Sequence, residues 1–127
     1  MRIVRSPEEI LRDAKTIAIV GASPNPGRPS HGVMRYLERA GYRCLPVNPL
    51  CADYWPSLAA LEEPVDLVDV FRRPEVCADV AREAAAIGAP ALWLQLGIRS
   101  AEARAVAASS GMDYVEDACT AVVHRYL

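Results

Sequence analysis

The sequence predicts an α/β domain with a doubly wound sheet of five parallel strands in the order 3-2-1-4-5, covered by helices on both faces. Apolar runs of strand length alternate along the chain with segments whose apolar residues recur at helical spacing. The expected crossover helices end at glycines, which suit the left-handed position that closes a helix. The 127 residues, 52% of them apolar, are enough for one compact domain spanning residues 1–127.

The first predicted elements are a short helix and a buried strand. Ser6, Pro7 and Glu9 occupy the cap, the first helical position and the position three residues after the cap. A helix is therefore expected to about Arg12. Residues 16–20, TIAIV, form an apolar run rich in β-branched side chains. That run is too short for a helix and predicts a strand buried on both faces.

A second helix and a second strand are expected before a long loop. Apolar residues recur at helical spacing over residues 33–40. Residues 42–48 alternate like a strand, although Pro46 weakens its far end. Residues 49–65 are too interrupted by proline for a full crossover helix. We expect a loop there, with one helical turn around residues 57–61.

The second half of the chain repeats the alternation of strand and helix. Strands are expected at residues 66–71, 91–96 and 113–115, helices at residues 76–87 and from Ser100 to Gly111, and a final helical turn in the last ten residues. Strands joined in this way pair in parallel through right-handed crossovers.

Charge and composition argue against several function classes. The net charge is −2, with 14 basic and 16 acidic residues and no basic stripe, which argues against nucleic acid as a partner. No apolar run reaches the ~20 residues of a membrane helix, and the charges near the start of the chain do not fit a signal peptide. Four cysteines without CxxC spacing, beside two histidines, predict reduced thiols in a cytoplasmic protein and no metal site.

Candidate functional residues follow from the expected topology. Ligands of an open parallel sheet bind beyond the carboxyl ends of the strands. In this sequence that rule selects four loops, at residues 21–30, 47–49, 71–74 and 95–99. Each loop admits a purely structural interpretation beside a functional one.

The first loop has the features of a phosphate site. Gly21 allows a sharp turn after the strand, and the backbone N–H groups of residues 21–23 can point at a phosphate. Ser30 is expected to cap the following helix, and Arg28 can add a charge-assisted hydrogen bond of about 1.5–3 kcal/mol. The alternative is a tight strand-to-helix connection without a ligand.

The second loop lacks the carboxylate of a dinucleotide site. An Asp or Glu normally follows the second strand and holds the ribose hydroxyls, but no acid lies between Arg39 and Ala52. Val47, Asn48 and Pro49 instead form an apolar, rigid edge with one amide, which suits an adenine ring. The missing acid argues against NAD, and the alternative is an ordinary Asn-Pro turn.

The third and fourth loops add cations and an amide. Arg72 and Arg73 can neutralise phosphates, unless they form a solvated pair matched to Glu75. Gln95 and Gly97 end a strand that we expect beside the first one, where the glutamine offers a donor and an acceptor and the glycine permits close backbone approach. The alternative is a buried glutamine satisfied by its neighbours.

Together the four loops resemble the CoA-binding domain family, a small Rossmann-like fold also found at the start of the succinyl-CoA synthetase alpha subunit. The resemblance is carried by IAIVGAS, RPSHGVMRYL, GYRCLPVNP, DLVDVFRRPE and LWLQLGI, and it covers nearly the whole chain. It is greatest to the single-domain members of the family. The resemblance implies that coenzyme A lies over the carboxyl edge of the sheet.

The resemblance also implies which residues meet coenzyme A, and where the chain departs from the family. Leu50 and Cys51 stand where synthetase relatives carry a lysine. His31 is a further candidate, because its ring near the start of the first crossover helix could touch a phosphate. The remaining implied contacts are Gly21, Ala22 and Ser23 with Arg28 and Ser30 for the phosphates, Val47, Asn48 and Pro49 for the adenosine side, and Phe71, Arg72, Arg73, Gln95, Leu96 and Gly97 for the rest.

The function predicted on these grounds is a stand-alone module that binds coenzyme A or an acyl-CoA without evident catalytic machinery. The synthetases need a phosphorylated histidine in a second domain and a nucleotide-grasping partner subunit, and 127 residues leave room for neither. The alternatives are an NAD(P)-binding or redox-sensing domain, and a structural partner subunit. Cys119 is a candidate reactive thiol if Asp117 caps a terminal helix, and a small buried side chain otherwise. The expected partner is a small molecule, with no nucleic acid and no membrane, while protein partners stay open.

Overall fold

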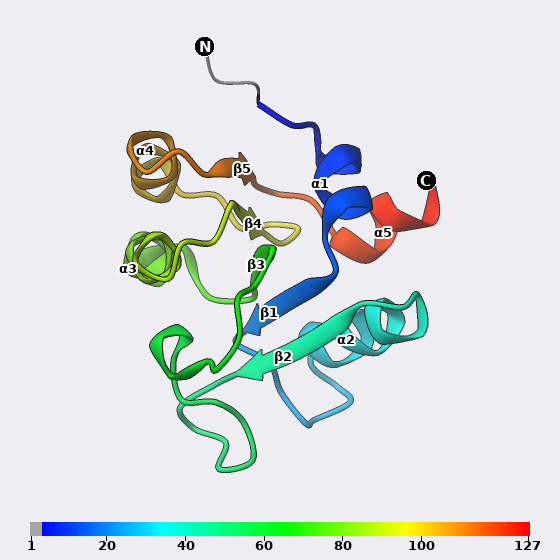
Figure 1. Ribbon diagram of the computed structural model, residues 1–127. Coiled ribbons are helices and arrows are strands. Elements are labelled where there is room, and N and C mark those ends of the chain that lie inside the picture. Colours follow the sequence, from blue (N-terminus) through cyan, green and yellow to red (C-terminus); the bar gives the residue numbers. More distant parts are fainter. Residues whose placement is uncertain (1–3) are drawn as a thin grey trace.

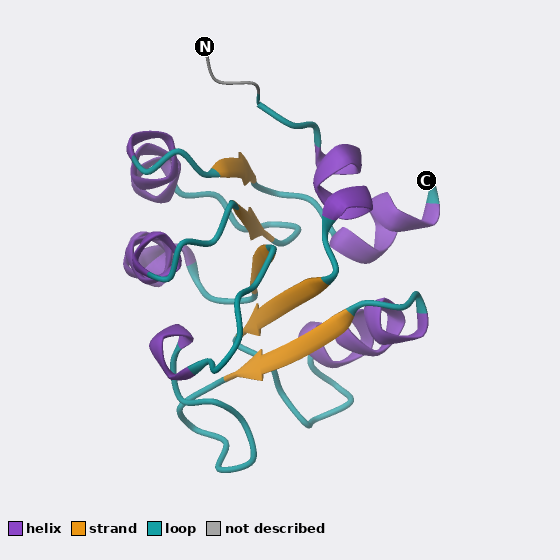
Figure 2. Ribbon diagram, viewed as in Figure 1, coloured by secondary structure: helices purple, strands orange, loops and turns teal. Residues whose placement is uncertain are grey.

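The computed structural model describes residues 4–127 and contains a five-stranded parallel sheet between two layers of helices (Figures 1 and 2). The predicted fold class is confirmed, and the expected elements are present with shifted ends. The strands are β1 (Thr16–Val20), β2 (Arg43–Val47), β3 (Leu67–Val70), β4 (Ala91–Leu94) and β5 (Asp113–Val115). The helices are α1 (Pro7–Asp13), α2 (Pro29–Arg39), α3 (Pro74–Ala86), α4 (Ala101–Ser109) and α5 (Thr120–Arg125), with a 3-10 turn, η1, at Leu58–Ala60.

Two apolar cores lie on opposite faces of the sheet, because successive residues of a strand point to opposite sides. One core packs α3, α4 and η1 against side chains such as Val68 and Leu92. The other packs α1, α2 and α5 against Ile17, Ile19 and Trp93. Figure 1 shows these two groups of helices on either side of the strands. Within residues 4–127, no helix has both the length and the apolar character needed to cross a membrane.

The strand order corrects the expectation. The order is β2-β1-β3-β4-β5, so the third strand lies between the first and the fourth instead of outside the second. The fourth strand consequently pairs with the third and not with the first. All residues of β3 are buried, as a strand with neighbours on both sides requires. β2 carries the exposed Arg43 and also Pro46, which cannot donate to a ladder, and both features suit an edge strand.

The long loop after β2 folds back over the carboxyl end of that strand. The N–H of Trp55 donates to the carbonyl of Pro46 at 3.1 Å, and the N–H of Asn48 donates to the carbonyl of Trp55 at 2.9 Å. Val47 and Trp55 form an isolated parallel bridge. The residues that follow β2 are thereby fixed at the carboxyl edge of the sheet.

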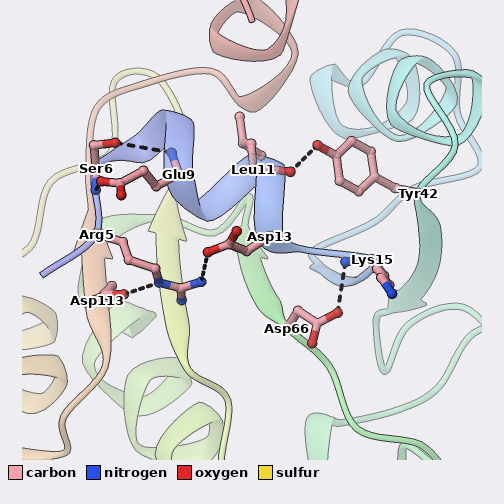
Figure 3. Close-up of polar contacts among 9 residues, drawn as sticks. All are labelled: Arg5, Ser6, Glu9, Leu11, Asp13, Lys15, Tyr42, Asp66 and Asp113. Atoms are coloured by element: carbon pink, nitrogen blue, oxygen red, sulfur yellow. Dashed lines mark hydrogen bonds and ion pairs between the residues drawn. The ribbon is translucent and has the colours of Figure 1, made fainter. Parts of the chain in front are cut away.

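The first helix starts as the sequence predicts. Ser6 caps α1 in a capping box: its Oγ accepts from the N–H of Glu9 at 3.1 Å, and the Glu9 carboxylate accepts from the N–H of Ser6 at 2.9 Å (Figure 3). The hydroxyl of Tyr42 donates to the carbonyl of Leu11 and ties the start of β2 to this helix.

Two charged side chains at the amino edge of the sheet, Arg5 and Asp66, bind a carboxylate and backbone N–H groups. Arg5 donates to Asp113 at the start of β5, at 2.7 Å. Asp66, just before β3, accepts from the N–H of Lys15 at 2.9 Å (Figure 3). It also accepts from the N–H of Thr16 at 2.9 Å. The Asp66 bonds join the beginnings of β1 and β3, and the Arg5 bond joins the segment before α1 to the start of β5. All of these contacts lie at the edge opposite the predicted site.

Candidate functional site

A cavity of about 860 Å³ opens at the carboxyl ends of the strands. Its walls come from the four loops that the sequence selected, which follow β1, β2, β3 and β4, from the start of α2, and from Cys119 just before α5. The fold therefore brings most of the predicted site residues together. Those that line the cavity are Gly21, Ser23, Arg28, Ser30, Asn48, Pro49, Phe71, Arg72, Arg73, Gln95 and Leu96.

The structure places four predicted residues outside the cavity. Ala22 and Val47 are buried in the body of the protein. His31 lies on another face of α2, where it lines a second, smaller hollow beside Arg35 and Glu38. Gly97 belongs to a turn with a φ of +85°, and its N–H donates to the carboxylate of Asp117 at 2.7 Å, so its role is to turn the chain.

The turn after β1 depends on the absence of a side chain at Gly21. The residue has a φ of +86°, and a Cβ there would lie 2.5 Å from the carbonyl oxygen of Phe71. The N–H of Gly21 donates to the carbonyl of Val47 at 2.9 Å. It therefore faces β2, whereas we expected it to point at a phosphate. The N–H of Phe71 in turn donates to Val20 at 2.8 Å. Gly21 thus lies where the ends of β1, β2 and β3 meet, beside the cavity.

Gly21→Ala should destabilise the fold by about 2 kcal/mol or more, because the added Cβ meets a backbone oxygen in a strained conformation. Denaturant unfolding measures the change. Gly32→Ala is the matched control, because it lies in α2 with nothing within 4 Å of the added Cβ. That variant should be neutral or more stable by up to ~1 kcal/mol. Equal stability of the two variants would contradict this account of Gly21.

The cavity has an unbalanced positive charge. Arg28, Arg72 and Arg73 line it, and among its described lining residues none is acidic. Arg73 forms an exposed ion pair with Glu75 at 3.4 Å, which is the alternative that the sequence left open for this loop. In the part of the chain that the structure describes, Arg28 and Arg72 form no ion pair. These two guanidinium groups are available to an anionic ligand.

The helices α2 and α3 begin beside the cavity without a side-chain cap. Arg28 is the N-cap of α2 and Arg73 the N-cap of α3, and neither side chain bonds the first turn. This corrects the expectation for Ser30, which lies one residue inside α2 and is buried. By contrast, Ser100 caps α4 through a bond from the N–H of Ala103 at 3.0 Å. The uncapped starts of α2 and α3 add partial positive charge to the same region.

Asn48 serves the structure of the cavity wall. Its Nδ2 donates to the carbonyl of Ala22 at 2.9 Å, and its Oδ1 accepts from the N–H of Leu50 at 2.9 Å. The side chain therefore locks the loop after β2 onto the loop after β1. Pro49 and Leu50, which is 94% exposed, then form an apolar rim. An apolar edge at Pro49 was predicted, whereas Leu50 was noted only as a departure from the lysine of synthetase relatives.

The floor of the cavity contains a buried polar network. Gln95 Nε2 donates to Asp69 Oδ1 at 2.6 Å and to Thr120 Oγ1 at 2.8 Å, and Thr120 Oγ1 donates to Asp69 Oδ2 at 3.0 Å. The nitrogen of Gln95 is satisfied by its neighbours, as the structural alternative proposed. Burial raises the pKa of Asp69 to about 7, against an ordinary value of 3.8. An acid within the apolar run LVDV was the signal for this network, but its partners come from distant segments.

Asp69 should lower the stability of the protein as pH rises from about 4 to 7. In that window the folded chain retains a proton on Asp69 that the unfolded chain has lost. The free energy of unfolding therefore falls by up to ~1.4 kcal/mol for each pH unit. Asp69→Asn has no titrating group at this position, so it lacks this pH dependence. Denaturant unfolding of both proteins should show the variant gaining ~2 kcal/mol relative to wild type between pH 5 and 8. Groups with lowered pKa values, such as Glu9, act equally in both proteins and cancel. A constant difference would contradict the assignment.

Comparison with known proteins decides the family. A family model described as a CoA binding domain matches residues 15–125, which include every loop around the cavity. The chain belongs to this CoA-binding domain family.

Other proteins are similar to this CoA-binding domain over most or part of its length. The uncharacterized protein YneT of Bacillus subtilis (strain 168) is 38% identical over 122 residues, which cover 92% of this chain and 90% of YneT. A solved structure from Thermus thermophilus, cell-free ID.343, is 40% identical with a TM-score of 0.90, covering 96% of this chain and 98% of its own. A dinucleotide-forming acetyl-coenzyme A synthetase 1 of Ca. Korarchaeum cryptofilum shares the fold at 23% identity and a TM-score of 0.68, over 79% of this chain and 25% of its own.

Cys119 lines the cavity of this CoA-binding domain in a way that differs from the prediction. It is itself the N-cap of α5, without a capping bond. Asp117, expected to be the cap, has a φ of +54° and binds Gly97 and Arg99 instead. Sequence reasoning also missed the apolar lining residues Pro29, Val33, Leu50 and Ile98, which lie next to the residues it selected.

Proposed function

We propose that the cavity binds coenzyme A or an acyl-CoA, as a module without a catalytic constellation of its own. The observation that carries the proposal is a positive cavity at the carboxyl edge, in a chain that belongs to a CoA-binding domain family. Its volume of about 860 Å³ falls within the roughly 300–1,000 Å³ of ligand pockets. The whole chain, at a net charge of −2, would otherwise repel a polyanion.

The cations suggest how the ligand lies. Arg28 and Arg72 stand on the loops after β1 and β3, near the middle of the sheet, and suit the phosphates. Pro49 and Leu50, beyond the edge strand β2, offer an apolar surface to the adenine ring. The pantetheine arm then extends past β3 toward Gln95 and the end of β4.

We infer that this module works in a reducing compartment. Cys44, Cys51, Cys77 and Cys119 are all free thiols. Thiols of this kind persist in the cytoplasm, where we place the protein. We propose a small-molecule ligand as the main partner and no nucleic acid or membrane.

Removal of the unpaired cations should weaken CoA binding selectively. Arg28→Ala and Arg72→Ala each remove a charge-assisted contact of about 1.5–3 kcal/mol, which corresponds to a loss of roughly ten- to a hundredfold in affinity. Calorimetric titration measures the loss. Arg82→Ala is the matched control, because that arginine pairs with Asp79 on an exposed surface of α3 outside the cavity.

A ligand panel separates this proposal from its rivals. CoA or acetyl-CoA at 100 times its dissociation constant should stabilise the protein by ~2.7 kcal/mol in thermal unfolding. NADH and ATP should have smaller effects at the same concentration. Preferential stabilisation by NADH would favour a dinucleotide site, and no effect of any nucleotide would overturn ligand binding at this cavity.

Bound CoA should also protect Cys119 from alkylation. Burial raises the pKa of Cys44 to about 12 and that of Cys77 to about 11, so both thiols should react slowly. In a Cys51→Ser variant, iodoacetamide should therefore modify Cys119 first, and mass spectrometry can follow the rate. Saturating CoA should slow this reaction at least severalfold, whereas an unchanged rate would place the ligand away from α5.

A further inference from the structure

The network on the cavity floor fixes one side chain in a single orientation. Asp69, Gln95 and Thr120 are 0%, 4% and 0% exposed, and they come from β3, the end of β4 and the first turn of α5. Both oxygens of Asp69 accept: Oδ1 from Gln95 at 2.6 Å, and Oδ2 from Thr120 at 3.0 Å. Because a carboxylate only accepts, it selects the nitrogen end of the Gln95 amide.

The other end of the Gln95 amide is left for a ligand. Among the described residues, every side-chain nitrogen or oxygen that is inaccessible to solvent has a hydrogen-bond partner. Gln95 Oε1 takes part in no bond within the described protein, whereas Nε2 makes two. Because Oε1 has no partner, it must be accessible to solvent. Gln95 lines the cavity, so Oε1 is accessible from there. The floor of the cavity presents a fixed acceptor.

We propose that Asp69 is a positioning residue, which holds Gln95 so that its carbonyl oxygen accepts a hydrogen bond from an amide N–H of the bound ligand's pantetheine arm. The inference rests on the proposed function and deepens it. Gln95 lies past β3 from the edge strand β2, on the side away from the adenine surface, so the arm reaches it and the nucleotide does not. Recognition of an amide at this position would favour the arm over other extensions of a nucleotide.

A proton on Asp69 would remove the fixed orientation. One carboxyl oxygen then becomes a donor and can pair with Gln95 Oε1, so that the amide turns over and offers its nitrogen to the cavity. Burial places the pKa of Asp69 near 7, where this exchange is measurable. Its register partners, Ile19 on β1 and Trp93 on β4, are uncharged. The titratable groups nearby are the Cys44 thiol on β2, with a pKa raised to about 12, and Cys119 before α5.

The test is the ratio of CoA affinities of wild type and Asp69→Asn, measured by calorimetry from pH 5.5 to 8.5. An asparagine can donate or accept and does not select one amide orientation. Wild type should bind CoA about three- to tenfold more tightly at pH 8, the effect of one hydrogen bond, and the ratio should approach one below pH 6. Titration of the phosphates of CoA cancels in this ratio. Thr120→Val, which breaks the same network from α5, should show a smaller loss.

Two controls separate positioning from damage to the fold. Adenosine 3′-phosphate 5′-diphosphate, which lacks the arm, should bind wild type and Asp69→Asn equally. Asp66→Asn removes a carboxylate charge at the amino edge, where Asp66 Oδ2 accepts from the N–H groups of Lys15 and Thr16, and it should bind CoA as tightly as wild type.

The outcomes are distinct. A CoA affinity ratio near one at every pH, an equal loss for the nucleotide fragment, or a loss in Asp66→Asn would each overturn the positioning role. Failure of wild type to bind either probe would instead overturn the proposed function, and this inference with it.

Discussion

The close approach of Gly21 to the carbonyl of Phe71 is the constraint on which the site depends. A Cβ at Gly21 would lie 2.5 Å from that oxygen, so the loops after β1 and β3 can meet only at a glycine. The same residue bonds β2 through Val47 at 2.9 Å. Parallel strands bring their carboxyl ends to one edge, but this contact decides how tightly the loops gather there. With a side chain at this position, the loops that carry Arg28 and Arg72 would have to move apart.

The two edges of the sheet differ in whether their charged side chains have partners within the protein. At the amino edge, Arg5 and Asp66 are engaged by a carboxylate and by backbone N–H groups (Figure 3). At the carboxyl edge, two arginines and the uncapped starts of α2 and α3 face a cavity with no acid among its described lining residues. The first edge stabilises the fold, whereas the second keeps its positive charge for a ligand.

Local sequence patterns predicted the elements well because each was encoded within a few neighbouring residues. The capping pattern at Ser6 and the apolar run of β1 are examples, and both are confirmed. The strand order was harder, because it depends on how the connection between β2 and β3 crosses the sheet. The clue in the sequence was Pro46, which suits an edge strand. The uniform burial of β3, which suits the middle of the sheet, is visible only in the structure.

The site was predicted at the level of loops and less well at the level of atoms. Choosing the loops needed only the rule that strand ends meet. Assigning roles needed distances: Gly97 turns toward Asp117, and Gln95 has its nitrogen bound by Asp69 and Thr120. Thr120 lies 25 residues after Gln95 along the chain, so no local pattern links them.

The covered end of β2 has a consequence for how the molecule meets its own copies. An open sheet edge is a template on which further strands can add, the first step toward fibrous aggregates. Pro46 offers no N–H to an incoming strand, and its carbonyl is already taken by Trp55 at 3.1 Å. At the opposite border, β5 spans just 3 residues. Both borders of the sheet thus offer an incoming strand few backbone groups with which to pair.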